Sequence, residues 1–166
     1  MKRFILTMLF AMAIIAISSC GLDKLKNNVE YDFYIMNETE SAVNFTLYFY
    51  HRETSQLPTE KVISIESGAC VPLFNGLVIG EEFSYTDEDI FYKTLIGDPR
   101  EDSYAEAVRS DNGKSIRWSP NEIETDSFYS SANWAFEEKE ANGKTYKKWT
   151  YILEDTIFEN IALNHQ

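Results

Sequence analysis

Cysteine and histidine are the residue types from which nucleophilic or metal chemistry is most often built, and this chain has only two of each. The cysteines are Cys20 and Cys70, and the histidines are His51 and His165. Neither histidine lies in a Gly-x-Ser-x-Gly context, and no Cys-x-x-Cys pair is present. The sequence therefore predicts neither a nucleophile-and-base pair nor a structural zinc site. We expect no enzyme, no bound metal and no cofactor.

The surroundings of Cys20 indicate a different chemistry. Two basic residues precede an almost uninterrupted apolar run from residue 4 to 17. The run is shorter than the roughly 20 residues that a membrane-spanning helix needs. A basic start and a short apolar core are typical of a secretory signal peptide. The run ends in the sequence ISSCG, residues 17–21, which resembles the bacterial lipobox: an aliphatic residue, two small residues, then the cysteine.

This resemblance implies that Cys20 carries a lipid and that residues 1–19 are a signal peptide cut before it. One acyl chain gives only reversible membrane binding, whereas the two or three chains of a lipoprotein cysteine hold a protein on the membrane. Gly21 stands where the inner-membrane retention signal of enterobacterial lipoproteins has Asp. We therefore expect the outer membrane of a Gram-negative bacterium, facing either the periplasm or the cell surface. Cys70 then has no disulfide partner, and we expect it to be a small buried hydrophobe.

The charge of the chain excludes one class of partner. It has 27 acidic and 15 basic residues, a net charge of −12, and such a surface repels nucleic acid. The acidic groups at 87–89 and 98–102 are candidates for Ca²⁺ ligands. No Asp-x-Asp-x-Asp-Gly pattern is present, however, and we interpret these residues by default as acidic side chains exposed to solvent. Acids adjacent on a strand point to opposite faces, which argues against the paired carboxylates of a glycosidase.

Alternation at period two, rich in β-branched and aromatic residues, dominates from residue 30 onward. We expect residues 20–29 to be the lipidated cysteine and a polar tether. Residues 30–166 should form one all-β domain, a single antiparallel β-sandwich of about 8–9 strands, immunoglobulin-like or transthyretin-like. The strands expected before the hairpins described next are 31–35, 43–49, 62–65, 70–74, 82–85 and 90–96.

Two hairpins can be assigned in register. Asn142-Gly143 is a preferred two-residue hairpin loop. It places Trp134 opposite Tyr151, with further pairs Ala132–Leu153, Phe136–Trp149, Glu137–Lys148 and Glu138–Lys147. Asp111-Asn112-Gly113 suits a three-residue loop, which puts Val108 opposite Ile116 and Glu106 opposite Trp118. The first hairpin combines turn, aromatic pairs and opposite charges in one register, and a slip of one residue would misplace all of them.

The C-terminal part also resembles a known group. The stretches DSYAEAVRSDNGKSIRW and SSANWAFEEKEANGKTYKKWTYILEDTIFENIAL, which cover about residues 102–162, are similar to the end of small Bacteroidetes-type outer-membrane lipoproteins of unknown function. The resemblance implies a β-sandwich envelope lipoprotein and supplies no catalytic residues. Asp155-Thr156-Ile157 also resembles the Asp-Ser/Thr-aliphatic O-glycosylation site of such bacteria, which makes Thr156 a candidate beside the plainer interpretation of a strand end.

Aromatic residues are the remaining candidates for a binding site. Trp134, Phe136, Trp149 and Tyr151 share one hairpin face and are expected in the core. Trp118, Tyr146 and Tyr48 are expected on the opposite or edge surfaces, where they are candidate ligand-binding aromatics. The sequence thus predicts a membrane-anchored envelope lipoprotein without enzymatic activity, structural or binding other envelope proteins. The alternative is a glycan-binding accessory lipoprotein that uses exposed aromatic rings.

Overall fold

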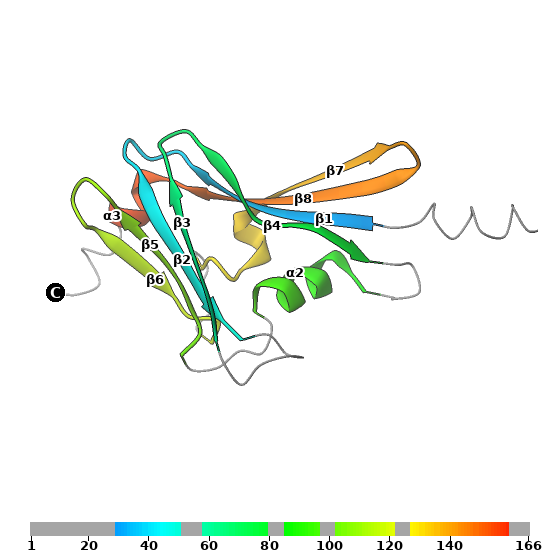
Figure 1. The fold of residues 1–166 in the computed structure, drawn as a ribbon, viewed down its shortest axis with the longest axis horizontal. Helices are drawn as coiled ribbons and strands as arrows, with labels where there is room; N and C mark the ends of the chain where they lie inside the picture. Colours follow the sequence, from blue (N-terminus) through cyan, green and yellow to red (C-terminus); the bar gives the residue numbers. More distant parts are fainter. Residues whose placement is uncertain (1–28, 51–57, 80–84, 97–101, 122–126, 160–166) are drawn as a thin grey trace, which may run out of the picture.

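Two four-stranded β-sheets face each other in the structure (Figure 1). The computed structural model describes residues 29–50, 58–79, 85–96, 102–121 and 127–159. Sheet A has the strand order β4-β1-β8-β7, and sheet B has the order β3-β2-β5-β6. In chain order the strands are β1 Val29–Asn37, β2 Val43–Phe49, β3 Thr59–Ile65, β4 Cys70–Ile79, β5 Tyr104–Arg109, β6 Ser115–Trp118, β7 Trp134–Ala141 and β8 Lys144–Leu153. The predicted all-β sandwich is confirmed.

In the part of the chain that the structure describes, three short helical segments accompany the sheets: α2 Asp87–Leu95, the 3₁₀ turn η2 Ser131–Asn133, and α3 Asp155–Glu159. Helix α2 lies below sheet A and beside sheet B in Figure 1. Among the described residues, no helix has the length and apolar character needed to cross a membrane.

One strand pair is parallel. β1 runs parallel to β8, with Val29 opposite Thr145 and Asn37 opposite Leu153, and the other described pairs are antiparallel. A parallel pair needs a long connection, and here the connection includes all the strands from β2 to β7. β1 and β2 lie in different sheets, whereas the immunoglobulin arrangement places the first two strands in the same sheet.

The alternation predicted from the sequence determines which side chains enter the core. Tyr31, Phe33 and Ile35 of β1 are buried, and so are the side chains at the odd-numbered positions of β2, while the residues between them are half-buried or exposed. Because successive side chains on a strand point to opposite faces, each sheet contributes one apolar face to the space between them. Phe128, Trp134 and Tyr151 join these faces, with ring centroids of Phe128 and Trp134 5.0 Å apart.

The β7–β8 hairpin has the predicted register. Trp134 lies opposite Tyr151, Phe136 opposite Trp149 and Glu138 opposite Lys147. Asn142 and Gly143 both have positive φ, 54° and 71°, as this turn requires. Two details of the prediction are wrong. Ala132 lies in η2 and not opposite Leu153, and Phe136 is 40% exposed because the tip of the hairpin projects beyond sheet B in Figure 1.

The strand predicted over 90–96 is wrong, because these residues belong mostly to helix α2. Thr86 caps the helix: its hydroxyl accepts from the Asp89 N–H, and the Asp89 carboxylate accepts from the Thr86 N–H. This capping box satisfies donors that would otherwise be unpaired at the start of the helix. Ile90, Phe91 and Leu95 form its buried face. The strand expected over 82–85 lies outside the described residues except for Tyr85, which precedes the helix.

The second predicted hairpin is displaced by one residue. Trp118 lies opposite Ala105, and Ile116 lies opposite Ala107. The loop has four residues and not three, since the Arg109 N–H donates to the Lys114 carbonyl and closes residues 110–113 between them. The slip moves Trp118 to the inner face of sheet B, where the small side chain of Ala105 leaves room for its ring.

Candidate functional site

The three aromatic residues predicted as ligand contacts do not form one site. Trp118 is 6% exposed, and its ring contacts those of Phe128 and Tyr151 at centroid distances of 5.8 and 5.7 Å, so the expectation that it is exposed is wrong. Tyr48 lies on β2 of sheet B, whereas Tyr146 lies on β8 of sheet A. Of the three, we follow Tyr48, because its ring contacts those of Tyr50 and Tyr104.

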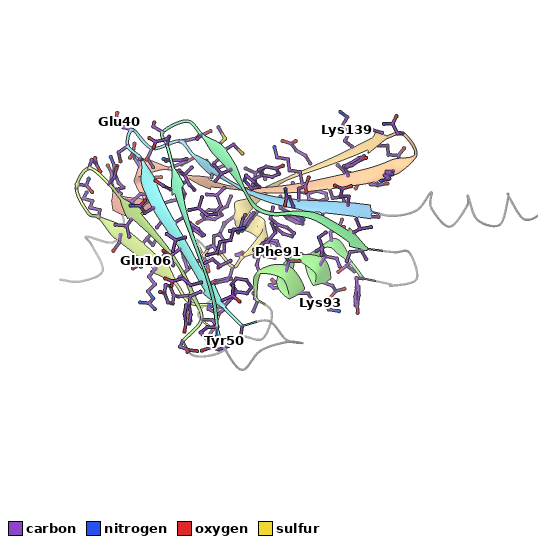
Figure 2. All side chains as sticks on the ribbon, viewed as in Figure 1. Glu40, Tyr50, Phe91, Lys93, Glu106 and Lys139 are labelled. Carbon is purple, nitrogen blue, oxygen red and sulfur yellow. The ribbon has the colours of Figure 1, made fainter. Side chains whose placement is uncertain are left out.

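Tyr48 belongs to the face of sheet B that points away from sheet A. We call this surface the sheet B outer face, and Glu106 in Figure 2 marks it. The inward residues that alternate with it include Ala105, Ala107 and Trp118, all of which are buried. Its members are Asn44, Thr46, Tyr48, Glu60, Val62, Ser64, Tyr104, Glu106, Val108, Ser115 and Arg117. No lysine occurs among them, and Val62 on the edge strand β3 is 62% exposed.

Three side chains on this face form a stack that crosses three strands. The rings of Tyr48 and Tyr104 lie nearly parallel, 14° apart, with centroids separated by 5.3 Å. The Arg117 guanidinium lies over the Tyr104 ring, with Cζ 3.5 Å from its centroid. Because β2 and β6 flank β5 on opposite sides, Tyr104 is covered from both sides, by Tyr48 and by Arg117. The ring of Tyr104 therefore offers no free face on which a sugar could stack.

The stack leaves the charge of Arg117 available. Glu106 lies directly opposite Arg117 in the β5–β6 register, yet no ion pair forms between them. Within the described part of the chain, no hydrogen bond engages the Arg117 guanidinium either. Arg109 on the neighbouring strand differs, because Asp111 and Asp155 both pair with it. A guanidinium held flat on a ring keeps its in-plane N–H donors free, in the geometry that binds a carboxylate through two hydrogen bonds.

Tyr50 and Asp102 fix one end of the stack. The Tyr50 hydroxyl donates to Asp102 Oδ2 at 2.5 Å, and this hydrogen bond is the chief cause of a raised pKa for the Tyr50 phenol. Its ring meets that of Tyr48 edge to face, with centroids 6.0 Å apart. Figure 2 places Tyr50 at the end of β2. The contact limits the positions open to the Tyr48 ring. Tyr48 is therefore restrained by Tyr50 as well as by Tyr104.

A second polar cluster lies on the inner face of sheet A and anchors helix α2. Asp87 accepts from the Tyr31 hydroxyl at 2.7 Å and from Lys147 Nζ at 2.7 and 2.9 Å. Burial and the hydrogen bond to Asp87 raise the pKa of Tyr31. Burial lowers the pKa of Lys147, but the hydrogen bonds and charges of Asp87 and Glu138 outweigh this effect and leave it raised. These contacts are internal, and we assign the cluster a structural role.

The remaining sequence candidates are accounted for as follows. Asp87 is paired with Lys147 and Asp89 caps its own helix, and no group of three or more potential metal ligands occurs among the described residues. Cys70 is exposed at the start of β4, so the prediction that it is buried is wrong. Thr156 is exposed in α3, and its hydroxyl donates to Glu154 at 3.3 Å. Cys20, both histidines and the acidic group 98–101 lie outside the described residues.

Sequence reasoning missed Tyr104 and Arg117. The pattern Tyr-Ala-Glu-Ala over 104–107 was a usable signal, because it places Tyr104 and Glu106 on the face opposite two alanines. Arg117 could be placed only with the four-residue loop, since the three-residue loop puts it on the wrong face. Together the fold and this surface define a β-sandwich with an outward tyrosine–arginine stack. Neither a protein-family model nor a curated protein sequence matches the chain, so its function is inferred from its sequence, fold and surface.

Proposed function

We propose that this chain is a lipoprotein of the Gram-negative outer membrane, anchored through Cys20, that binds another envelope protein through the sheet B outer face. The observation that carries the proposal is the stack of Tyr48, Tyr104 and Arg117, in which the guanidinium has no hydrogen-bond or ion-pair partner among the described residues. The anchor is supported by the lipobox-like residues 17–21 at the end of a signal-peptide pattern.

The composition of the face favours a protein partner. Protein interfaces are enriched in tyrosine and arginine and depleted in lysine, and in antibody binding loops Ser and Asn supply adaptable hydrogen bonds. The sheet B outer face has this composition, whereas the outer face of sheet A carries Asp32, Lys148 and Glu137 side by side on three strands. Charged side chains of alternating sign are typical of a solvated surface.

The chemistry of Arg117 indicates what the partner supplies. A stacked guanidinium with free donors suits a carboxylate, and Glu106 in the same row accepts hydrogen bonds from a hydroxyl or a cationic group. Val62, Thr46, Glu106 and Arg117 occupy one row across all four strands of the sheet. We infer a partner surface with an acidic side chain or chain terminus at its centre and apolar contact toward Val62.

Glycan binding is the weaker alternative. A sugar platform needs exposed ring faces, and Tyr104 is covered on both sides while Trp118 is buried. An enzymatic role has less support, because Glu137 and Glu138 follow each other on a strand and so point to opposite faces of sheet A, where they lie opposite Lys148 and Lys147.

The anchor can be tested with Cys20→Ala. Without the thioether-forming cysteine no diacylglycerol can be attached, so we expect this variant to move from the membrane fraction to the soluble envelope fraction. The measurement is the distribution of the full chain between fractions after sodium carbonate extraction, with Cys70→Ser as the matched control that stays in the membrane. A Cys20→Ala chain that is processed and still sediments with membranes contradicts the anchor.

A further inference from the structure

One end of sheet A carries most of the exposed apolar side chains of the two sheets. We call it the sheet A end, and it comprises residues 29–31, 77–79 and 136–148. Among the described strands, four large apolar side chains are exposed, and three of them, Leu77, Val78 and Phe136, lie at this end. The fourth, Val62, belongs to the sheet B outer face. Exposed apolar side chains gathered in one place mark contacts with proteins or with membranes.

The described chain begins at the same end. Val29 lies opposite Ile79 on one side and Thr145 on the other, so β1 starts between the end of β4 and the start of β8. Eight residues separate Val29 from Cys20, and a fully extended stretch of that length spans at most about 30 Å. A lipid on Cys20 therefore keeps the sheet A end close to the membrane. Figure 2 places Lys139 at this end of sheet A and Glu40 at the opposite end.

The two ends also differ in charge. Among the described residues, the sheet A end carries four acidic and four basic side chains. The opposite end carries seven acidic and two basic side chains, over residues 38–42, 66–69, 109–114 and 154–159. Lys139 and Lys144 beside the β7–β8 turn are exposed, whereas Lys147 pairs with Asp87. Because anionic lipids attract basic groups and repel acidic ones, a membrane surface favours the sheet A end over the opposite end.

We propose that the sheet A end docks into the headgroup layer of the membrane that holds Cys20, with Leu77 and Val78 against lipid and Lys139 and Lys144 at the phosphates. Apolar side chains bind at the boundary between headgroups and acyl chains, and lysine stems lie along apolar surface while their ammonium groups stay in water. The contact is small, but the anchor makes it intramolecular and so gives it a high effective concentration. This step rests on the proposed anchor at Cys20.

Docking of this end determines the direction of the sheet B outer face. Figure 2 places Glu106, which marks that face, on the other side of the molecule from Lys139. With the sheet A end on the membrane, the sheet B outer face points away from the lipid and is open to a partner protein. A chain held by its lipid alone would present this face in many directions, so docking reduces the orientational freedom that is lost on binding.

Quenching of a fluorophore on the lipidated full chain tests the proposal. The native Cys70 is exposed at the start of β4, and Val78 lies eight residues further along the strand, about 26 Å away. The probe is an environment-sensitive fluorophore on Cys70 of the wild type, or on residue 78 of Cys70→Ser/Val78→Cys. The chain is purified from membranes and reconstituted into vesicles of phosphatidylethanolamine and phosphatidylglycerol that contain nitroxide lipids. We expect quenching at position 78 to be at least about threefold stronger than at position 70.

Two lysines in equivalent hairpin positions provide the matched variants. Lys144 follows Gly143 at the sheet A end, and Lys114 follows Gly113 at the opposite end, and both lysines are exposed. Lys144→Glu should reduce the quenching at position 78 by at least about twofold, because it places a carboxylate against the lipid phosphates. Lys114→Glu makes the same change of charge away from the membrane and should leave the quenching unchanged.

Flotation with the vesicles separates this proposal from the anchor. A chain that floats with the vesicles but is quenched equally at positions 70 and 78 overturns the docking while the anchor stands. The same holds if Lys144→Glu and Lys114→Glu have equal effects. A wild-type chain that does not float overturns the anchor, and the docking fails with it. Cys20→Ala should show neither flotation nor quenching at position 78.

Discussion

Replacing Asn37 by alanine is expected to lower the free energy of unfolding by about 3 kcal/mol. Asn37 ends β1, is fully buried, and connects three parts of the chain at one corner of the sandwich. Its Nδ2 donates to the carbonyls of Ser41 and Ile65, each at 2.9 Å. Its Oδ1 accepts from the Thr39 N–H at 3.0 Å and from the Thr39 hydroxyl at 2.7 Å.

The size of this effect follows from what the substitution leaves behind. An alanine removes four hydrogen bonds, among them those to the Ile65 carbonyl and the Thr39 N–H, whereas the Ser41 carbonyl still accepts from the Thr39 hydroxyl. A buried group left without a partner costs about 1–3 kcal/mol. Asn44→Ala is the matched control, because Asn44 is exposed on the sheet B outer face and its loss should change stability by less than about 0.5 kcal/mol. Urea unfolding of both variants measures the difference. Equal midpoints would show that this corner does not hold the sheets together.

Phe91→Ala is expected to be at least as damaging, at about 3–5 kcal/mol. Phe91 is fully buried, and it brings helix α2 into contact with sheet A. Its ring centroid lies 5.2 Å from that of Trp149, 5.4 Å from that of Trp134 and 6.2 Å from that of Phe33. Removing the ring leaves a cavity among large aromatic groups that cannot move to fill it.

The neighbours of Phe91 distinguish a helix from the strand that the sequence predicts here. In the helix, adjacent Ile90 and Phe91 are both buried while Tyr92 is 39% exposed. We therefore expect Ile90→Ala to destabilise by about 2–4 kcal/mol and Tyr92→Ala by less than about 1 kcal/mol. On a strand, adjacent residues point to opposite faces, so Ile90 and Tyr92 would behave alike. Chemical denaturation of the three variants provides the comparison, and similar effects at 90 and 92 would contradict the helix.

The register of the β7–β8 hairpin could be predicted because independent signals agree on it. Asn142-Gly143 selects the turn, the aromatic residues select the face, and the pairs of Glu137 with Lys148 and Glu138 with Lys147 exclude a slip. The β5–β6 hairpin lacked this redundancy. Its loop of Asp111-Asn112-Gly113 is compatible with more than one length, and the single opposite-charge pair that favours the observed register, Glu106 with Arg117, was the only signal against the shorter loop.

Helix α2 was missed because composition and capping give opposite indications. Ile90, Phe91, Tyr92 and Ile96 are residues typical of strands, and the apolar positions from 90 to 96 cover fewer than two helical turns. Thr86 followed by Asp89 was the signal for a helix start, since a short acid three residues after a threonine can complete a capping box. The local hydrogen bonds of that cap and the burial of Phe91 determine the outcome.

The candidate site was predicted only in part, for a geometric reason. Tyr48 could be assigned to an outer face from the alternation of β2. Its neighbours Tyr104 and Arg117 come from strands more than fifty residues away in the sequence, and their contact depends on the exact β5–β6 register. An error of one residue in that register exchanges Arg117 for Trp118 on the outer face, and this exchange made a buried tryptophan the wrong candidate.

The central claim, that the sheet B outer face binds a protein partner through Arg117, is tested most directly by photo-cross-linking at Val62. Val62 lies in the same row as Arg117 and is 62% exposed, so a photoreactive amino acid there replaces no core contact. In the cell that naturally carries the chain, we expect one discrete protein adduct, identified by mass spectrometry. Its yield should fall at least about tenfold with Arg117→Glu and less with Arg117→Lys, because lysine keeps the charge but not the fork of donors. An adduct whose yield is the same with Arg117→Glu, or no greater than that from a probe at Lys139, would contradict the claim.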